Sequence, residues 1–269
     1  MTATRGILNP AAGLKNFSLS RIPPEGELTE FLETYWIVQW DLPDGQHYLS
    51  ETIPFPVVHM VFETRRPEIY GVTTKRFSRK LLGKGRAFGV KFRPSMFYPF
   101  FGKPLCELTD RVVSVRSIFG DAGTVLRKSI MQESAENECV KLAQLFLTER
   151  LPGKNSLAHE LRDIVELIAT DRNITRVEQI ALLAGCGIRQ LQLNFRKYVG
   201  VSPKWVIMRY RLQEAADSIS RGEVKNITEL ALQLGYFDQA HFTKEFSAVI
   251  GKPPQTYLMD QIAASEITS

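Results

Sequence analysis

The stretch ITELALQLGYFDQAHFTKEFSAVIGKPP, Ile227 to Pro254, decides how the second half of this chain folds. Apolar residues recur at helical spacing on both sides of Gly235, a residue that permits the positive φ required by a tight turn. Ala231, four residues before that glycine, is small enough to let two helices cross closely. The pattern therefore predicts a helix-turn-helix.

An earlier stretch, VEQIALLAGCGIRQLQLNFRKYVGVSP from Val177, repeats this pattern with one residue fewer after the turn. Alanine, glycine, apolar residues and proline occur in the same order at matching positions of both copies. The matched pairs are Ala181 and Ala231, Gly185 and Gly235, Leu191 and Phe242, Phe195 and Phe246, Gly200 and Gly251, and Pro203 and Pro254. The sequence therefore predicts two helix-turn-helix units.

The second helix of each unit has an apolar face and a polar face. Residues at i, i+4 and i+8 are expected to face the core: Leu191, Phe195 and Val199 in the first copy, and Phe242, Phe246 and Ile250 in the second. Side chains of Arg, Gln, Thr and Ala can read base edges in a major groove that admits one helix. The predicted DNA-reading residues are Arg189, Gln190, Gln192, Leu193, Arg196 and Lys197, and then Gln239, Ala240, Thr243 and Lys244.

The two second helices begin differently. Asp238 can cap the second copy by accepting hydrogen bonds from free backbone N–H groups, whereas Gly187 offers the first copy a weaker cap. From Ile188 to Gln213 the chain has six basic residues and no acid. Contact with DNA phosphates is the simpler account of this run, and a solvated basic face is the alternative. The six are Arg189, Arg196, Lys197, Lys204, Arg209 and Arg211, of which Arg209 is also expected to contact DNA.

Residues from about 156 to 258 resemble the DNA-binding domain of the AraC/XylS family of bacterial transcription regulators. The resemblance implies two helix-turn-helix units joined by a long helix, Ser202 to Ser220. Their recognition helices would enter successive major grooves, roughly 34 Å apart, so that a monomer reads a site with two unlike halves. The sequence departs from the family pattern at Gly187, at Leu193 with Asn194, and at Lys244, where the family usually has Ser, Arg with an apolar residue, and Arg.

The first half of the chain is predicted to be rich in β-structure. Short β-branched and aromatic runs at 35–42, 57–63 and 87–92 predict a mainly antiparallel sheet or partial barrel from about Glu30 to Pro94. Helical patterns near 120–132 and 136–151 are expected to close this domain. The expected fold class is a two-domain α+β protein whose second domain is all helical. The expected boundaries are 1–151 for a regulatory domain, 152–156 for a linker, 157–260 for the DNA-binding domain and 261–269 for a tail.

Residues Gly89 to Gly120 resemble the N-terminal regulatory domain of a subset of the same family, which implies an effector-sensing or dimerising module. Between Thr64 and Arg93 there are ten basic residues against one acid, Glu68. Solvated strand edges and loops explain such a cluster, since Lys and Arg discourage edge-to-edge pairing. An anionic effector and an auxiliary contact with DNA are the alternatives. The aromatic cluster of Phe97, Tyr98, Phe100 and Phe101 is expected in the core, with a hydrophobic ligand pocket as the alternative.

Composition argues for a cytoplasmic protein. The chain has three cysteines, an odd number, and its N-terminus lacks a continuous apolar run, so neither a disulfide framework nor a membrane span is expected. The formal charge of +5 favours a polyanionic partner only mildly. His47 and His59 could meet in a sheet, but no Cys or carboxylate pattern completes a metal site, and no cofactor is expected.

The sequence thus predicts a sequence-specific DNA-binding transcription regulator, without enzymatic activity, whose partner is double-stranded DNA. Family analogy adds contact with RNA polymerase, activation rather than repression, and a small-molecule effector. A monomer or a homodimer is expected, and no membrane contact. Two alternatives stay open: a helix-turn-helix protein that acts through protein partners, and an enzyme whose catalytic domain is the N-terminal half.

Overall fold

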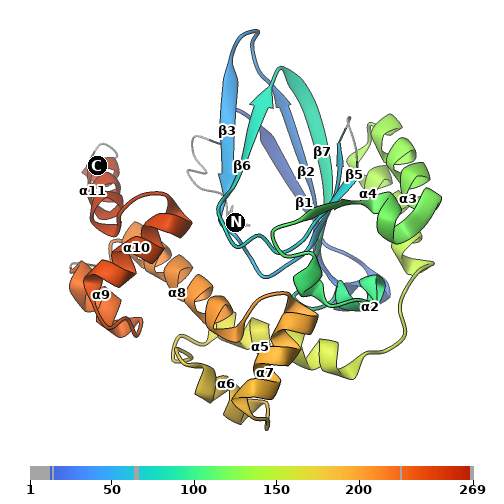
Figure 1. Cartoon of the computed structure of the whole chain (residues 1–269). Helices are drawn as coiled ribbons and strands as arrows, with labels where there is room; N and C mark the ends of the chain where they lie inside the picture. Colours follow the sequence, from blue (N-terminus) through green and yellow to red (C-terminus); the bar gives the residue numbers. More distant parts are fainter. Residues whose placement is uncertain (1–12, 14, 64–66, 225, 267–269) are drawn as a thin grey trace. The chain divides into compact units, whose positions relative to one another are not determined.

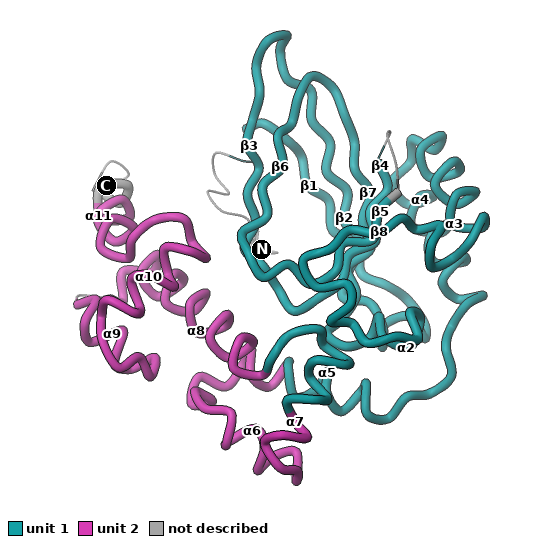
Figure 2. Tube along the Cα trace, in the orientation of Figure 1, with its two compact units in different colours: residues 1–165, 192–202 teal, residues 166–191, 203–269 magenta. Residues whose placement is uncertain are grey.

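The computed structural model describes residues 13, 15–63, 67–224 and 226–266 (Figure 1). The chain divides into two compact units (Figure 2). Unit 1 comprises Met1–Val165 and Gln192–Ser202, and unit 2 comprises Glu166–Leu191 and Pro203–Ser269.

Unit 1 is built on a six-stranded sheet of order β1-β2-β7-β4-β5-β8, in which every neighbouring pair is antiparallel. A separate antiparallel pair, β3 and β6, completes its β-structure (Figure 1). The strands are β1 (Ser18–Ile22), β2 (Leu32–Asp41), β3 (His47–Thr52), β4 (His59–Glu63), β5 (Pro67–Tyr70), β6 (Phe77–Leu82), β7 (Lys84–Phe92) and β8 (Val112–Ser114).

The predicted antiparallel sheet is confirmed, and its extent is larger than expected. The three runs read from the sequence correspond to β2, β4 and β7, whereas β1 and β8 lie outside the range 30–94. Strands β3 and β6 read HYLSET and FSRKLL, which are too polar to show the alternation of a half-buried strand.

Strand β2 is buried on one face and only half buried on the other. Tyr35 and Ile37 are buried, while Trp36 and Val38, which alternate with them, are not, as the period of two requires. Phe88 of β7 stacks on Tyr35 with ring centroids 6.2 Å apart. The alternation therefore gives β2 a packed side and a second side that is less buried.

Helices cover the end of the sheet, as the sequence predicted. Helix α3 (Val115–Gln132) packs against β4 and β5, and α4 (Glu136–Thr148) packs against α3. Short helical turns connect the strands: η1 (Gly26–Glu30), α2 (Tyr98–Phe101) and η2 (Leu105–Glu107). Within the aromatic cluster expected in the core, Phe97 is buried and its ring centroid lies 4.8 Å from that of Phe92, whereas Tyr98, Phe100 and Phe101 are only half buried.

The remainder of the described chain is helical, which confirms the two-part α+β fold class. The helices are α5 (Ser156–Thr170), α6 (Val177–Leu183), α7 (Ile188–Asn194), the π-helical segment η3 (Phe195–Val199), α8 (Pro203–Ser220), α9 (Ile227–Gln233), α10 (Gln239–Ile250) and α11 (Pro254–Glu266). Helix α8 is the long connecting helix that the resemblance implied.

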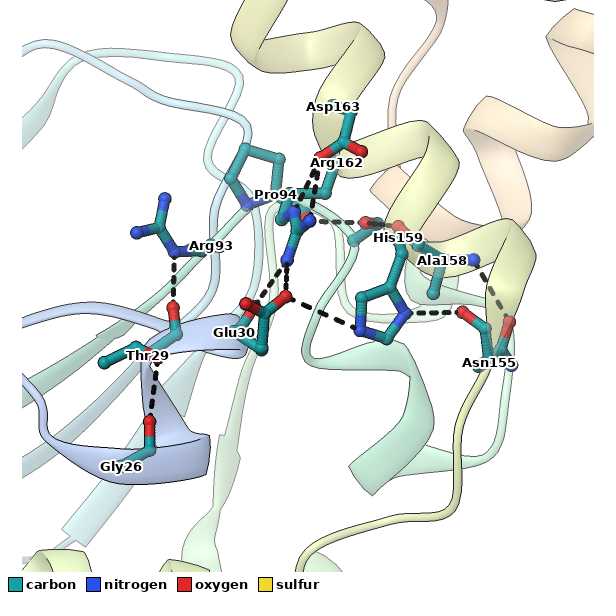
Figure 3. A network of polar contacts seen from close by, with 11 residues as sticks. Gly26, Thr29, Glu30, Arg93, Pro94, Asn155, Ala158, His159, Arg162 and Asp163 are labelled. Atoms are coloured by element: carbon teal, nitrogen blue, oxygen red, sulfur yellow. Dashed lines mark hydrogen bonds and ion pairs between the residues drawn. The ribbon is translucent and has the colours of Figure 1, made fainter.

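A polar network in unit 1 holds the first part of α5 beside η1 (Figure 3). Arg162, with 15% of its side chain exposed, donates from Nη1 to Oε2 of Glu30 at 2.6 Å and to the Glu30 carbonyl at 3.2 Å. Hydrogen bonding to Arg162 lowers the pKa of Glu30. The hydroxyl of Ser95 donates to the Ala158 carbonyl at 2.5 Å, so a second contact fixes the same part of α5.

The start of α5 falls where the sequence placed the end of a linker. Asn155 caps the helix, since its side-chain oxygen accepts from the backbone N–H of Ala158 at 3.1 Å. The helix begins at Ser156, yet its residues up to Val165 belong to unit 1. The predicted linker at 152–156 therefore stays a prediction. Because these contacts join the start of α5 to the β-rich part, the first compact unit continues past the linker to Val165.

Candidate nucleic-acid interface

The two turns between α6 and α7 and between α9 and α10 have the same backbone geometry. Gly185 has φ of 59° and Gly235 has φ of 81°, both in the left-handed region. In the first turn the N–H of Cys186 bonds to the Ala181 carbonyl at 3.1 Å, and in the second the N–H of Tyr236 bonds to the Ala231 carbonyl at 3.0 Å.

A second hydrogen bond completes each turn. The N–H of Gly185 bonds to the Leu182 carbonyl at 3.1 Å, and that of Gly235 to the Leu232 carbonyl at 3.0 Å. This pair of bonds is the Schellman motif, which satisfies the last carbonyls of a helix through a left-handed glycine. The predicted internal repeat is thus confirmed at the level of individual hydrogen bonds.

Side-chain caps fix the helix starts around the second turn. Asn226 accepts from the N–H of Thr228 at 2.9 Å and begins α9. Asp238 accepts from the N–H of His241 at 2.7 Å and begins α10, which confirms its predicted role. In the first copy, Gln179 reaches back to the N–H of Arg176 at 2.9 Å at the start of α6.

The apolar face of each second helix is buried as predicted. None of the six residues has more than 4% of its surface exposed: Leu191, Phe195, Val199, Phe242, Phe246 and Ile250. Phe246 packs against Phe242, with ring centroids 5.4 Å apart, and against Tyr257 of α11 at 5.8 Å. Because the apolar stripe is buried, the polar stripe of each helix is left at the surface.

Most of the predicted DNA-reading residues lie on that surface. The exposed residues are Arg189, Gln190, Gln192, Leu193, Arg196, Lys197, Gln239, Ala240 and Lys244, while Thr243 is half buried. The Oε1 atom of Gln239 accepts from the hydroxyl of Thr228 on α9 at 2.7 Å. This contact fixes the orientation of one predicted reading side chain, and DNA contact by the whole set stays a prediction.

Arg209 does not belong to this surface, which corrects the expectation that it contacts DNA. Only 2% of Arg209 is exposed, and its Nη2 lies 3.4 Å from Oε1 of Gln213 within α8. Arg211 is equally buried, donates to the carbonyl of Ile168 and pairs with Glu214 at 2.8 Å. Two of the six cations in the basic run therefore lie inside the helical unit rather than on its surface.

The end of the second helix in the first unit differs from that in the second unit. In η3 the N–H of Gly200 bonds to the carbonyl of Phe195, five residues back, whereas Gly251 bonds to Ser247, four residues back. The hydroxyl of Thr109 donates to the Gly200 carbonyl at 2.7 Å, and η2 packs against η3. The widened last turn thus lies where another part of unit 1 contacts it. The sequence gives no signal for this π-helical turn, since the apolar residues and the final glycine of this helix have the same spacing in both copies.

Phe237 is a surface residue that sequence reasoning missed. It is 95% exposed and directly precedes the cap of α10, a position where an aromatic side chain has no core to fill. Leu182 and Leu232, which match each other in the repeat, are also exposed, at 84% and 61%. Their exposure gives each unit an apolar spot beside its turn.

The basic cluster between Thr64 and Arg93 is largely engaged by acids and carbonyls of unit 1. Arg79 pairs with Glu63, and Lys91 pairs with Glu33 at 2.6 Å. Arg86 donates to the Ile130 carbonyl at 2.6 Å. Arg65 and Arg66, which also belong to the cluster, lie outside the described residues.

The described part of the chain contains no group of three or more His, Cys, Asp or Glu side chains able to hold a metal ion. His47 and His59 belong to different sheets. His241 lies on α10, with its ring 5.4 Å from that of Tyr236 and its Nε2 3.1 Å from Oε1 of Glu245. Among the same residues, no helix has the length and apolar composition needed to cross a bilayer.

Comparison with known proteins matches two regions of the chain. Residues 180–260 match a family described as a helix-turn-helix domain, and residues 20–114 match a domain of unknown function, DUF6597. An uncharacterized HTH-type transcriptional regulator of Haemophilus influenzae is 28% identical over 153 residues, which cover 57% of this chain and 49% of that protein. XylDLEGF operon transcriptional activator 1 of Pseudomonas putida is 33% identical over 89 residues, covering 32% of this chain and 27% of the activator.

This chain therefore spans about half, or less, of the length of these curated relatives. Among solved structures, a probable AraC family transcriptional regulator from Rhodopseudomonas palustris aligns with 37% of this chain and 94% of its own, at 26% identity and a TM-score of 0.34.

Proposed function

We propose that this chain, whose residues 180–260 match a helix-turn-helix domain family, is a transcription regulator that reads DNA with two recognition helices, α7 and α10. Each helix would lie in a major groove and contact base edges through its exposed polar stripe. The target would be an asymmetric site, because the two stripes differ in sequence.

The observation that carries this proposal is the duplicated turn. Two glycines at matched positions, Gly185 and Gly235, close the same pair of hydrogen bonds after α6 and α9. Each turn is followed by a helix with a buried apolar stripe and an exposed polar one. This duplication supports the same function for both helices, since burial of the apolar stripes does not by itself require polar, DNA-reading residue types on both exposed stripes.

Attraction between cationic side chains and phosphates would contribute more to binding of the first half-site than of the second. The exposed stripe of the first copy offers Arg189, Arg196 and Lys197, whereas the second offers Lys244 alone among the predicted contacts. Arg can bond bidentately to guanine, while Gln192 and Gln239 suit adenine and Thr243 suits thymine. Mutations in the first stripe should therefore change the salt dependence of binding most.

We also propose, on family analogy, that the bound protein contacts RNA polymerase and activates transcription in response to a small-molecule effector held by the β-rich domain. Oligomeric state would be set by that domain, as a monomer or a homodimer. No catalytic step is proposed.

Selection of binding sites from a random duplex pool by the full chain, at near-physiological salt, tests the DNA proposal. We expect an asymmetric motif with two boxes centred about 10 base pairs apart, one turn of the duplex. A palindromic motif would contradict reading by one chain with two unlike helices. Absence of enrichment, both for the full chain and for residues 155–269 alone, would refute DNA reading.

A protein partner is the second candidate for the helix-turn-helix surface. The exposed apolar residues Leu182, Leu193, Leu232 and Phe237 favour it. Salt separates the two functions, because log K for DNA falls with log salt at a slope near −0.9 per phosphate neutralised. An apolar protein interface should respond little over the same range.

A further inference from the structure

A cavity of about 240 Å³ lies between the six-stranded sheet and the β3–β6 pair, all within unit 1. Side chains of β2, β4 and β7 line one wall, and Phe77 and Leu81 of β6 contribute to the other. An apolar cavity of about 150 Å³ is large enough to take up benzene. This cavity is therefore large enough for an aromatic ring that carries a substituent.

Two tryptophans form the floor of this cavity. Trp36 and Trp40 on β2 are paired in register with Gly89 and Gly85 on β7. A Cβ atom at Gly89 would lie 2.0 Å from Cε2 of Trp36, and one at Gly85 would lie 2.2 Å from Cζ2 of Trp40. The indole rings thus lie directly against the β7 backbone, over the space that a side chain would fill.

Both indole N–H groups are already used by the protein. Trp36 donates to Nδ1 of His59 at 3.2 Å, and Trp40 donates to the Leu82 carbonyl at 3.2 Å. What the indoles offer to the cavity is therefore ring surface rather than hydrogen-bond donors. Phe55 and Phe77 add further aromatic lining. Such a lining favours a flat aromatic body, which can stack or meet the rings edge to face.

One end of the cavity is polar. Because Nδ1 of His59 accepts the Trp36 N–H, the neutral imidazole has its proton on Nε2, which makes no hydrogen bond among the described residues. Burial, helped by the nearby charges of Lys91 and Arg21, lowers the pKa of His59 to about 3. His59 is therefore a neutral N–H donor at physiological pH.

The charges at this end favour an anion. His59 and Lys91 are cross-strand partners on β4 and β7, and Arg21 on β1 pairs in register with Trp36. Glu33 offsets one cation through its 2.6 Å contact with Lys91. The charges of Lys91 and Arg21 both lower the pKa of His59, so the electrostatic field at its imidazole is positive. At the far end Arg79 and Glu63 form a neutral pair.

We propose that this cavity binds a planar aromatic carboxylate, with its ring on the indoles of Trp36 and Trp40 and its carboxylate at His59 and Lys91. The ligand class specifies the effector within the proposed function and rests on that function for its regulatory meaning. Binding itself does not require DNA, so the two can be tested separately.

Isothermal titration calorimetry of the full chain with benzoate and 2-naphthoate tests the ligand class. Benzamide retains the ring without the charge, and cyclohexanecarboxylate retains the charge without the aromatic ring. We expect at least one aromatic acid to bind at least tenfold more tightly than both controls. Equal binding of the amide or of the saturated acid would overturn the proposal, as would absence of heat from both aromatic acids at millimolar concentration.

Substitutions of the cations test where in the cavity the carboxylate binds. Lys91→Met should weaken binding of the aromatic acid about tenfold, whereas Lys141→Met, on the exposed surface of α4, should leave it unchanged. Circular dichroism checks that each variant is folded. If Lys91→Met does not fold, Arg21→Met removes the other cation of the same end and should have a similar effect. Unchanged affinity in a folded Lys91→Met or Arg21→Met variant would move the carboxylate away from this end and overturn the assignment.

A parallel titration with the selected duplex separates this inference from the proposed function. An aromatic acid that binds a chain unable to bind any duplex would support the cavity assignment and refute the DNA proposal. A chain that binds its duplex but none of the acids would overturn the assignment and leave DNA reading intact.

Discussion

The ring of Tyr98 lies against that of Tyr198, with centroids 4.1 Å apart. Tyr98 begins the short helix α2 of the β-rich domain, whereas Tyr198 lies in the π-helical end of the first recognition helix. The Nζ atom of Lys197 lies 5.6 Å and 5.2 Å from the centroids of these two rings. A hydrogen bond to Tyr98 raises the pKa of Lys197. Tyr98 of the β-rich domain therefore lies beside a cation that the sequence predicts to contact DNA.

Replacing Tyr98 by Phe should strengthen DNA binding. The variant retains the ring that packs on Tyr198 but removes the hydroxyl whose hydrogen bond raises the pKa of Lys197, so that one protein group fewer competes with a phosphate for its amino group. We expect affinity to rise a few-fold at low salt and the slope of log K against log salt to steepen by about 0.9, the effect of one added phosphate contact. Fluorescence anisotropy with the selected duplex at several salt concentrations measures both.

A second substitution, Lys197→Met, tests whether Lys197 causes the expected increase in DNA affinity of Tyr98→Phe. In the double variant with Tyr98→Phe, the increase in affinity and slope should disappear, because no amino group is left to release. If the double variant retains the gain, the effect of Tyr98→Phe comes from a change in ring packing rather than from Lys197.

Thr243→Glu should abolish specific binding without changing helical content. Thr243 lies between Gln239 and Ser247 on the polar stripe of α10, and a carboxylate there would face the acceptor-rich base edges and phosphates of a groove. Ala248→Glu adds the same charge at another exposed position of that helix and should cost much less. Anisotropy and far-ultraviolet circular dichroism are the measurements, and unchanged affinity in Thr243→Glu would remove α10 from the interface.

Phe246→Ala should destabilise the second helix-turn-helix unit by about 3 to 5 kcal/mol, the range for truncating a fully buried phenylalanine. Its ring is completely buried between Phe242 and Tyr257. Phe237→Ala is the matched control, because that side chain is 95% exposed and should contribute little to stability. Urea unfolding followed by circular dichroism compares the two variants. A similar decrease in the free energy of unfolding for both would contradict the burial of Phe246 on the inner face of α10.

The helix-turn-helix units were predictable from sequence because their signals are local. A glycine that needs positive φ, an alanine at a helix crossing and apolar residues at i, i+4 and i+8 lie within one short window, and Gly185 and Gly235 behave as expected. The same holds for the cap at Asp238, which depends only on its own helix.

Features that depend on distant parts of the chain were not predictable. Arg209 looks like a surface cation in its own helix, and only tertiary packing buries it. Gly89 looks like a weak point in a strand, yet its missing side chain is what admits Trp36 from β2. The π-helical turn at Phe195–Val199 shares its spacing with an ordinary α-helical turn in the second copy, so only the packing of η2 distinguishes the two.

Gly89→Ala should destabilise the β-rich domain through overpacking. The new Cβ would lie 2.0 Å from Cε2 of Trp36, so the indole must move into the cavity or the strands must separate. A cost of about 1 to 3 kcal/mol is expected for such a change, together with altered tryptophan fluorescence. Gly153→Ala, where a Cβ would meet no atom within 4 Å, should change neither. Equal stability of both variants would contradict the contact between Trp36 and β7.

The stability of the chain should also carry a pH dependence that comes from His59. Burial and nearby cations lower its pKa to about 3, against an ordinary value of 6.5. Between these values the unfolded chain binds a proton that the folded chain does not, so acidification favours unfolding, and the free energy of unfolding falls as pH drops below 6.5. The contribution is absent above that range, where His59 is neutral in both states.

His59→Gln isolates this contribution, because glutamine can still accept the Trp36 N–H but does not titrate. Between pH 7 and pH 5 the unmodified chain should lose roughly 1 to 2 kcal/mol more stability than the variant, the amount that one proton uptake on unfolding allows. Urea unfolding at several pH values measures the difference. Parallel stability curves for the two proteins would mean that His59 titrates normally and that its end of the cavity is open to water, which would also weaken the case for a neutral N–H donor at that site.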